Sequence, residues 1–160
     1  MSSRLALEAF RGTVSLTVEA LNAVRSRMEC PAPRVALGQA LRGVASSAID
    51  LSDGLVGDLG HVLAASNVGA RVDLDALPRS AMLARQPQEL QQECLLAGGD
   101  DYELLFTAPP GQREAVQALA PGLGVPLTRC GSIVAAAGLH LLDGSGRPVA
   151  FSGHGFDHFA

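Results

Sequence analysis

The stretch that decides the fold is Ser47-Ala-Ile-Asp50-Leu-Ser-Asp53-Gly-Leu-Val-Gly-Asp58-Leu-Gly60. It begins with a short apolar run and passes through a polar turn into a segment whose apolar residues recur with helical spacing. That spacing is typical of a helix with one buried stripe, formed here by Leu55, Val56, Leu59, Val62 and Leu63. The stretch therefore predicts a strand, a tight turn and a helix over 53–66.

Asp50, Ser52 and Asp53 lie at the junction between this strand and helix. A helix N-terminus favours anions, and carboxylates beside it can hold a Mg²⁺ ion shared with substrate phosphates. Ser52 would then donate a hydrogen bond to a phosphate oxygen. The alternative is that Ser52 or Asp53 is only the N-cap of the helix. Asp50 favours the metal interpretation, because it interrupts an apolar run where an unpaired carboxylate would be costly.

Length and composition indicate the size of the domain and exclude several classes of protein. The chain has 160 residues and 48% hydrophobic residues, enough for one packed domain. Its net charge is −4, and the absence of a basic run argues against nucleic-acid binding. No apolar stretch is long enough to span a bilayer, and the N-terminus lacks a signal-peptide pattern. Three scattered cysteines favour a reducing, cytoplasmic location over a disulfide framework.

A second polar cluster, Gly98-Gly99-Asp100-Asp101-Tyr102-Glu103, follows a predicted helix over 88–97 and precedes a predicted strand over 104–107. Paired glycines let a backbone approach a ligand closely. Acids just after a helix C-terminus oppose the helix dipole, which favours a functional role. The alternative is a polar turn that ends the helix.

The other expected elements alternate irregularly along the chain, which favours a mixed sheet covered by helices. We expect Asp58 to be solvated and His61 to be partly exposed. His154 and His158 are four residues apart, but the glycines around them argue against a helical zinc site, and their roles stay open, as do those of Asp101 and Glu103. The remaining predicted helices are 3–29 with a break at Gly12, 35–42 and 112–120; the remaining strands are 69–74, 125–136 and 138–142.

The first 32 residues differ in character from the rest. A helical segment followed by Pro31-Ala-Pro33 is typical of a connection between two domains. We therefore interpret residues 1–32 as a helical remnant and linker from a missing N-terminal domain, and residues 33–160 as the domain proper. The surface that would meet the missing domain is expected to carry an apolar patch.

Four motifs in order resemble the thiamine-monophosphate kinase family. They are Pro33-Arg-Val-Ala-Leu-Gly-Gln-Ala-Leu41, Ala48-Ile-Asp-Leu-Ser-Asp-Gly-Leu55, Gly98-Gly-Asp-Asp-Tyr-Glu-Leu104 and Gly155-Phe-Asp-His-Phe159. The resemblance is to the C-terminal domain of that kinase, which belongs to the superfamily related to aminoimidazole ribonucleotide synthetase. It covers roughly residues 30–160.

The resemblance implies an α/β fold of the α+β type, with three α/β/α layers, a mixed sheet and a partly ferredoxin-like arrangement. It implies transfer of the γ-phosphoryl group of ATP to thiamine phosphate, with Asp50 and Asp53 as Mg²⁺ ligands and Ser52 as an ATP contact. Asp100, at a position that the family often fills with Glu, would contact thiamine phosphate, and Phe156 would line the substrate rings.

The resemblance also implies an N-terminal domain that carries further acidic metal ligands and the interface of a homodimer, so we expect this chain alone to be inactive. Two alternatives stay open. One is a non-catalytic domain of the same fold that binds a ligand or partner. The other is a related ATP-dependent synthetase with a different substrate.

Overall fold

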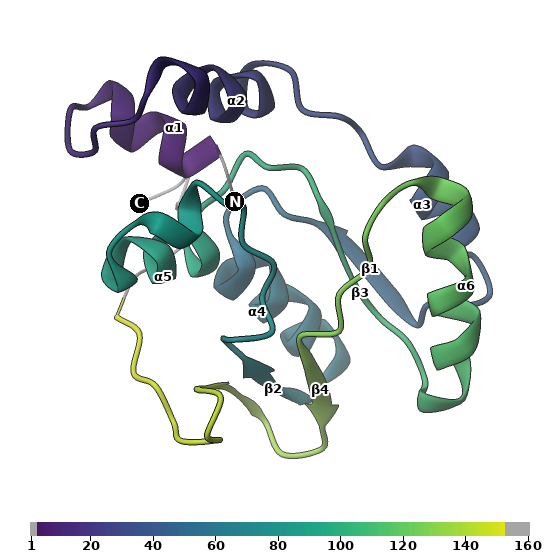
Figure 1. Cartoon of the computed structure of the whole chain (residues 1–160). Helices are drawn as coiled ribbons and strands as arrows, with labels where there is room; N and C mark the ends of the chain where they lie inside the picture. Colours follow the sequence, from purple (N-terminus) through teal and green to yellow (C-terminus); the bar gives the residue numbers. More distant parts are fainter. Residues whose placement is uncertain (1–2, 153–160) are drawn as a thin grey trace.

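The computed structural model describes residues 3–152, and Figure 1 shows their arrangement. The helices are α1 (Ser3–Phe10), α2 (Val18–Glu29), α3 (Val35–Ala40), α4 (Leu55–Ser66), α5 (Gln88–Leu96) and α6 (Arg113–Leu123), with short 3₁₀ turns η1 (Leu83–Arg85) and η2 (Pro110–Gln112). The strands are β1 (Ser47–Asp50), β2 (Gly69–Asp73), β3 (Leu104–Thr107), β4 (Gly131–Val134) and β5 (Gly138–Leu142).

The described strands form two small sheets. β1 pairs with β3 in antiparallel register, with Asp50 opposite Leu104 and Ser47 opposite Thr107. In the second sheet, β2 lies between β4, which is antiparallel to it, and β5, which is parallel to it. The predicted α/β class with a mixed sheet is therefore confirmed, and the mixed sheet is the three-stranded one.

The core lies between α4, α5, β2 and the first helix. Of the stripe that the sequence predicted for α4, Leu55, Leu59 and Leu63 are buried, while the two valines in it are half-buried. Alternate residues of β2 and the turn after it face the same core, as period-2 strand geometry requires. Burying each large side chain stabilises the fold by about 1.5–3 kcal/mol. The other buried members include Leu5, Ala6, Val24, Ala70, Val72, Leu74, Cys94, Leu95 and Leu96.

Helix α1 packs closely against the rest of the structure. Its Leu5 and Ala6 are fully buried in the common core, and Arg4 forms an ion pair with Glu93 of α5. Figure 1 shows α1 and α2 together along one side of the molecule, above α5. Phe10 and Val18, where the two helices connect, remain 52% and 71% exposed.

Among the element boundaries that differ from the sequence prediction, two involve prolines. The predicted strand over 125–136 is shorter, because only residues 131–134 pair with β2 and Pro126 cannot donate to a sheet. Helix α6 continues to Leu123 instead of ending at 120, and Pro121 lies in its last turn. The helix ends at Gly124, which has a left-handed φ of 61° and donates to the Ala120 carbonyl.

No helix within residues 3–152 is long and apolar enough to cross a membrane.

Candidate functional site

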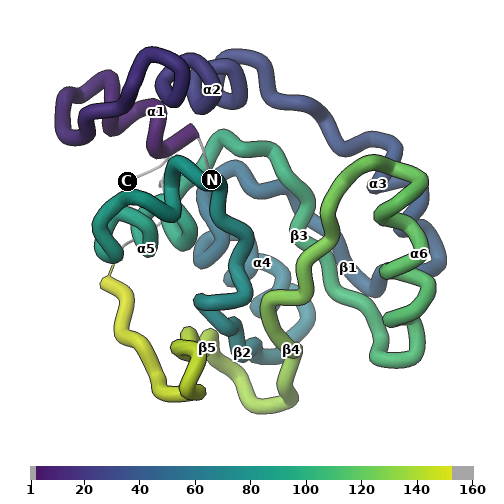
Figure 2. Tube along the Cα trace, in the orientation of Figure 1, coloured from purple at the N-terminus to yellow at the C-terminus, as the bar shows by residue number. Residues whose placement is uncertain are grey.

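The two polar motifs of the sequence meet at one end of the β1–β3 pair. Beyond the paired strands, Leu51 donates its backbone N–H to Glu103 at 2.8 Å, and Tyr102 donates to Leu51 at 3.1 Å. A third bond runs from the Asp100 N–H to the Ser52 carbonyl at 3.1 Å. Figure 2 shows the segment that leads into β3 running beside the segment that follows β1. The loops 51–54 and 98–103 are thus held together by backbone hydrogen bonds.

Glycines make this close approach of the two loops possible. A Cβ atom on Gly99 would lie 2.0 Å from the Ser52 carbonyl oxygen. Gly54 has a φ of 108°, and a Cβ atom there would lie 2.8 Å from the backbone of Ala97. Because the contacts are with backbone atoms, which cannot swing aside, larger side chains would push the loops apart.

The loop 51–54 is organised by Asp58, a residue that the sequence analysis expected to be solvated. That expectation is wrong: Asp58 is only 2% exposed. Its Oδ2 atom accepts the backbone N–H groups of Ser52 at 3.0 Å, Asp53 at 3.2 Å and Gly54 at 3.1 Å. Burial raises the pKa of Asp58, while these three hydrogen bonds act in the opposite direction.

Neither Ser52 nor Asp53 is the N-cap of α4, which was the alternative that the sequence analysis considered. The residue at the N-cap of α4 is Gly54, which has no side chain to cap the helix. The Asp58 carboxylate binds the N–H of this N-cap residue and those of the two residues before it, so it fixes the turn that leads into the helix. The signal for this role was present in the sequence, since Asp58 lies three residues after Leu55, on the buried stripe of the helix.

The predicted site residues lie on the open side of the joined loops. Asp50 and Asp100 are exposed, while Ser52 and Asp53 are half-buried. The exposure of Asp50 corrects the sequence argument, because this carboxylate ends β1 at the surface and bears no burial cost. Acidic and hydroxyl side chains are thus presented together from β1 and the two loops.

Tyr102 lies near enough to three carboxylates for each of them to affect its phenol. The Asp100 carboxylate is the main cause of a raised pKa of the Tyr102 phenol, and the charges of Asp50 and Asp53 act in the same direction. The phenol donates to the Asp100 carboxylate at 3.4 Å, and the Tyr102 residue is 42% exposed. The sequence analysis gave Tyr102 no role of its own.

The backbone of loop 98–103 is strained at two positions. Asp100 and Tyr102 have φ values of 62° and 49°, in the left-handed region that residues other than glycine rarely adopt. Such conformations persist where the surrounding structure imposes them, and they are frequent at ligand sites.

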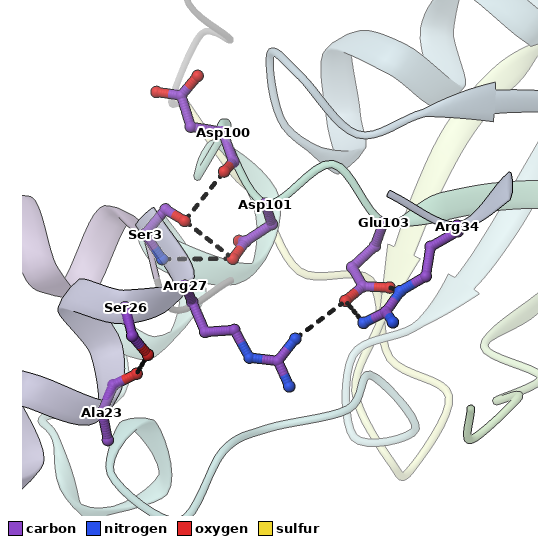
Figure 3. A network of polar contacts seen from close by, with 8 residues as sticks. All are labelled: Ser3, Ala23, Ser26, Arg27, Arg34, Asp100, Asp101 and Glu103. Carbon is purple, nitrogen blue, oxygen red and sulfur yellow. Dashed lines mark hydrogen bonds and ion pairs between the residues drawn. The ribbon is translucent and has the colours of Figure 1, made fainter. Parts of the chain in front are cut away.

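The other two acids of the motif bind the N-terminal part of the chain (Figure 3). The Asp101 carboxylate accepts the backbone N–H of Ser3 at 3.3 Å and its hydroxyl at 3.2 Å. Glu103 accepts two hydrogen bonds from the Arg34 guanidinium, at 2.7 and 2.6 Å. This pairing lowers the pKa of Glu103 and raises the pKa of Arg34. The sequence analysis did not predict either contact.

The donor set matches Mg²⁺ better than a transition metal. Within residues 3–152, no group of three or more His, Cys, Asp and Glu side chains could hold a metal ion. Mg²⁺ does not require such a group, because it often binds through one or two carboxylates together with water and substrate phosphates. The carboxylates of Asp50 and Asp53 are hard oxygen donors of this kind. Phe156, His154 and His158 lie outside the described residues.

Comparison with known proteins identifies the family. The sequence model described as "AIR synthase related protein, C-terminal domain" matches residues 12–143. The chain belongs to this family. The predicted resemblance is thereby confirmed, and it extends to curated relatives named thiamine-monophosphate kinase.

Two curated relatives are similar to this chain over most of its length. The thiamine-monophosphate kinase of Salmonella typhimurium is 50% identical over 132 residues, which cover 81% of this chain and 40% of that protein. The corresponding protein of Escherichia coli K12 is 48% identical over the same coverage. The chain thus spans about 40% of the length of these curated relatives.

Solved structures agree with the sequence comparison. The thiamine-monophosphate kinase of Stenotrophomonas maltophilia K279a has a TM-score of 0.82 and 40% identity, covering 92% of this chain and 48% of that one. The structure of AaThiL complexed with AMPPCP and TMP has a TM-score of 0.75 and 26% identity, covering 99% of this chain and 48% of that one.

Proposed function

We propose that this chain is the C-terminal part of an ATP-dependent thiamine-phosphate kinase, which converts thiamine phosphate and ATP to thiamine diphosphate and ADP. The observation that carries the proposal is the backbone junction of loops 51–54 and 98–103. It supports the proposal because the loop with Ser52, which we propose to contact ATP, lies against the loop with Asp100, which we propose to contact thiamine phosphate. The names of the relatives support the reaction, as does the related AaThiL structure with AMPPCP, an ATP analogue, and TMP.

The residues divide into two groups by loop. Asp50 and Asp53 would hold Mg²⁺, and the half-buried Ser52 hydroxyl would donate to a phosphate oxygen of ATP. Asp100 would contact thiamine phosphate, with Phe156 as an aromatic wall beside its rings. Mg²⁺, when bound, supplies positive charge that offsets the charge on the phosphate oxygens.

Direct phosphoryl transfer suits this arrangement, because the reaction requires alignment of donor and acceptor rather than a covalent nucleophile. The chain's own contribution is to hold the two loops at a fixed separation. The three bonds of Asp58 fix the first loop, and backbone hydrogen bonds hold the second loop against it.

The complete kinase would need more than this chain. We propose that an N-terminal domain supplies further acidic ligands and the interface of a homodimer, and that this chain alone turns over too slowly to measure. We also propose a cytoplasmic location, which the three free cysteines favour.

The test uses a chimera in which this chain replaces the matching region of the Escherichia coli relative. Phosphorus NMR with Mg²⁺, ATP and thiamine phosphate should show thiamine diphosphate and ADP forming with the chimera but not with the chain alone. The Asp53→Asn chimera is the matched variant, and it should lose the reaction because a metal ligand is removed.

Other outcomes would favour the alternatives. A chimera that binds both ligands without forming product would indicate a non-catalytic binding domain. Hydrolysis of ATP without thiamine diphosphate would indicate another acceptor. Turnover by the chain alone at about 1 per second or faster would contradict the need for a further domain.

A further inference from the structure

Alternate residues of the segment 100–103 lie in two different environments. Asp100 and Tyr102 are exposed and have left-handed backbone conformations. Asp101 and Glu103 bind the N-terminal part of the chain instead. In Figure 3 the Asp100 carboxylate points away from Ser3, whereas the Asp101 carboxylate points towards it.

The first anchor of the loop is the start of α1. Ser3 is 2% exposed, and its hydroxyl donates to the Asp101 carboxylate at 3.2 Å and to the Asp100 carbonyl at 3.0 Å. The Ser3 backbone N–H also donates to the Asp101 carboxylate. A carboxylate at a helix N-terminus is favourable, because the backbone donors there have no partner within the helix.

The second anchor is the connector between α2 and α3. Arg34 is 17% exposed at its side chain and binds Glu103 with two parallel hydrogen bonds, a geometry that restricts the orientation of both groups. Arg27 of α2 approaches the same carboxylate to 4.0 Å. Both anchors therefore come from residues 3–34, which lie far from the loop in sequence.

We infer that Asp101 and Glu103 are positioning residues, through which the docking of residues 3–34 holds Asp100 and Tyr102 towards the ligand. Asp100 and Tyr102 are left-handed residues other than glycine, and such conformations persist only where the surrounding structure constrains the backbone. The two anchors supply this constraint, because they hold the residue that follows each left-handed residue. The expected effect on ligand binding rests on the proposed role of Asp100 in binding thiamine phosphate. The expected effect on the conformation of the loop does not depend on that role.

The chain offers a direct probe of this loop, because Tyr102 is the single tyrosine and the sequence has no tryptophan. Intrinsic fluorescence therefore reports on loop 98–103 alone. We would measure acrylamide quenching of this fluorescence and amide hydrogen exchange of residues 99–103 in the chain itself. The variants are Glu103→Gln, Arg34→Ala and the partly conservative Arg34→Lys.

The matched control is Arg25→Ala, which removes an exposed ion pair with Glu29 on α2 that does not touch the loop. Glu103→Gln and Arg34→Ala should accelerate exchange in the loop by about fivefold, the effect of losing a pair worth roughly 1 kcal/mol. Arg34→Lys should give an intermediate rate, and the control should match the wild type. If Glu103→Gln and Arg34→Ala show the same exchange rates and the same quenching as the Arg25→Ala control, the inference is overturned.

A ligand measurement separates this inference from the proposed function. In the chimera, Arg34→Ala should weaken thiamine phosphate binding by about fivefold while leaving Mg²⁺–ATP binding within about twofold. Equal weakening of both ligands would contradict a positioning role specific to Asp100 and Tyr102. If the wild-type chimera binds no thiamine phosphate, the proposed function fails, but the exchange and fluorescence results still decide the anchoring.

Discussion

Replacement of Asp58 tests how the loop that would carry the metal ligands is held. Its carboxylate accepts three consecutive backbone N–H groups, at 3.0, 3.2 and 3.1 Å. In Asp58→Ala these donors lose their acceptor, a side chain that is itself only 2% exposed. In Asp58→Asn the amide oxygen can still accept hydrogen bonds from these donors. The substitution also removes the buried negative charge, and it is this burial that raises the pKa of Asp58.

The size of the effect follows from the burial of the three donors. A hydrogen bond to a charged group contributes about 1.5–3 kcal/mol when its loss leaves the donor unsatisfied. Only the bond from Gly54 is fully buried, so water can partly replace the other two. We expect Asp58→Ala to lower the free energy of unfolding by about 3 kcal/mol, and Asp58→Asn by about 1 kcal/mol, since one acceptor atom remains.

Urea denaturation followed by circular dichroism measures this loss. With an m-value of about 2 kcal/mol/M, the midpoint should fall by about 1.5 M for Asp58→Ala and about 0.5 M for Asp58→Asn. The control is Asp73→Ala, which removes one exposed bond to the Asp75 N–H and should stay within about 0.5 kcal/mol of the wild type. If Asp58→Ala is no less stable than this control, Asp58 does not organise the loop.

Three further predictions concern the junction of the loops. Gly99→Ala places a Cβ 2.0 Å from the Ser52 carbonyl oxygen and should lower the melting temperature by about 5 °C or more. Gly122→Ala, with no atom within 4 Å of the new Cβ, should not lower it, and equal effects would refute the close approach. The pKa of Glu103 is lowered from its usual value of 4.5 by Arg34, so the ion pair stabilises the fold fully at pH values above 4.5. The difference in the free energy of unfolding between the wild type and Glu103→Gln should disappear as the pH falls through the lowered pKa. A difference that instead grows on acidification would contradict the pairing. Asp100→Asn should lower the raised pKa of Tyr102 towards 10, since Asp100 is its main cause, as measured by tyrosinate absorbance; an unchanged titration would refute the contact.

Local patterns in the sequence predicted the elements that carry the site. The helical stripe of Leu55, Leu59 and Leu63 is buried as expected, and Asn67 ends α4 in a left-handed conformation with a φ of 52°. These features depend on residues within a few positions of one another. The strand at β1 and the turn after it follow from the same kind of local signal.

Long-range features could not be obtained in the same way. The register of β1 against β3 joins residues more than fifty positions apart, and only this register places Gly99 against Ser52. The contacts of Asp101 with Ser3 and of Glu103 with Arg34 are similarly distant in sequence. The roles of Asp50, Ser52, Asp53 and Asp100 stay predictions, supported by their common location and by the relatives.

The most direct test of a single site shared by both loops is phosphorus NMR of thiamine phosphate bound to the chimera, with Mn²⁺ in place of Mg²⁺ and a nonhydrolysable ATP analogue. A paramagnetic ion held by Asp50 and Asp53 should broaden the thiamine phosphate resonance beyond the effect of free Mn²⁺. The Asp53→Asn chimera should lose this excess by losing the metal, and Asp100→Asn should lose it by releasing the substrate. Excess broadening that persists in both variants, or that is absent from a wild-type chimera with both ligands bound, would contradict the shared site.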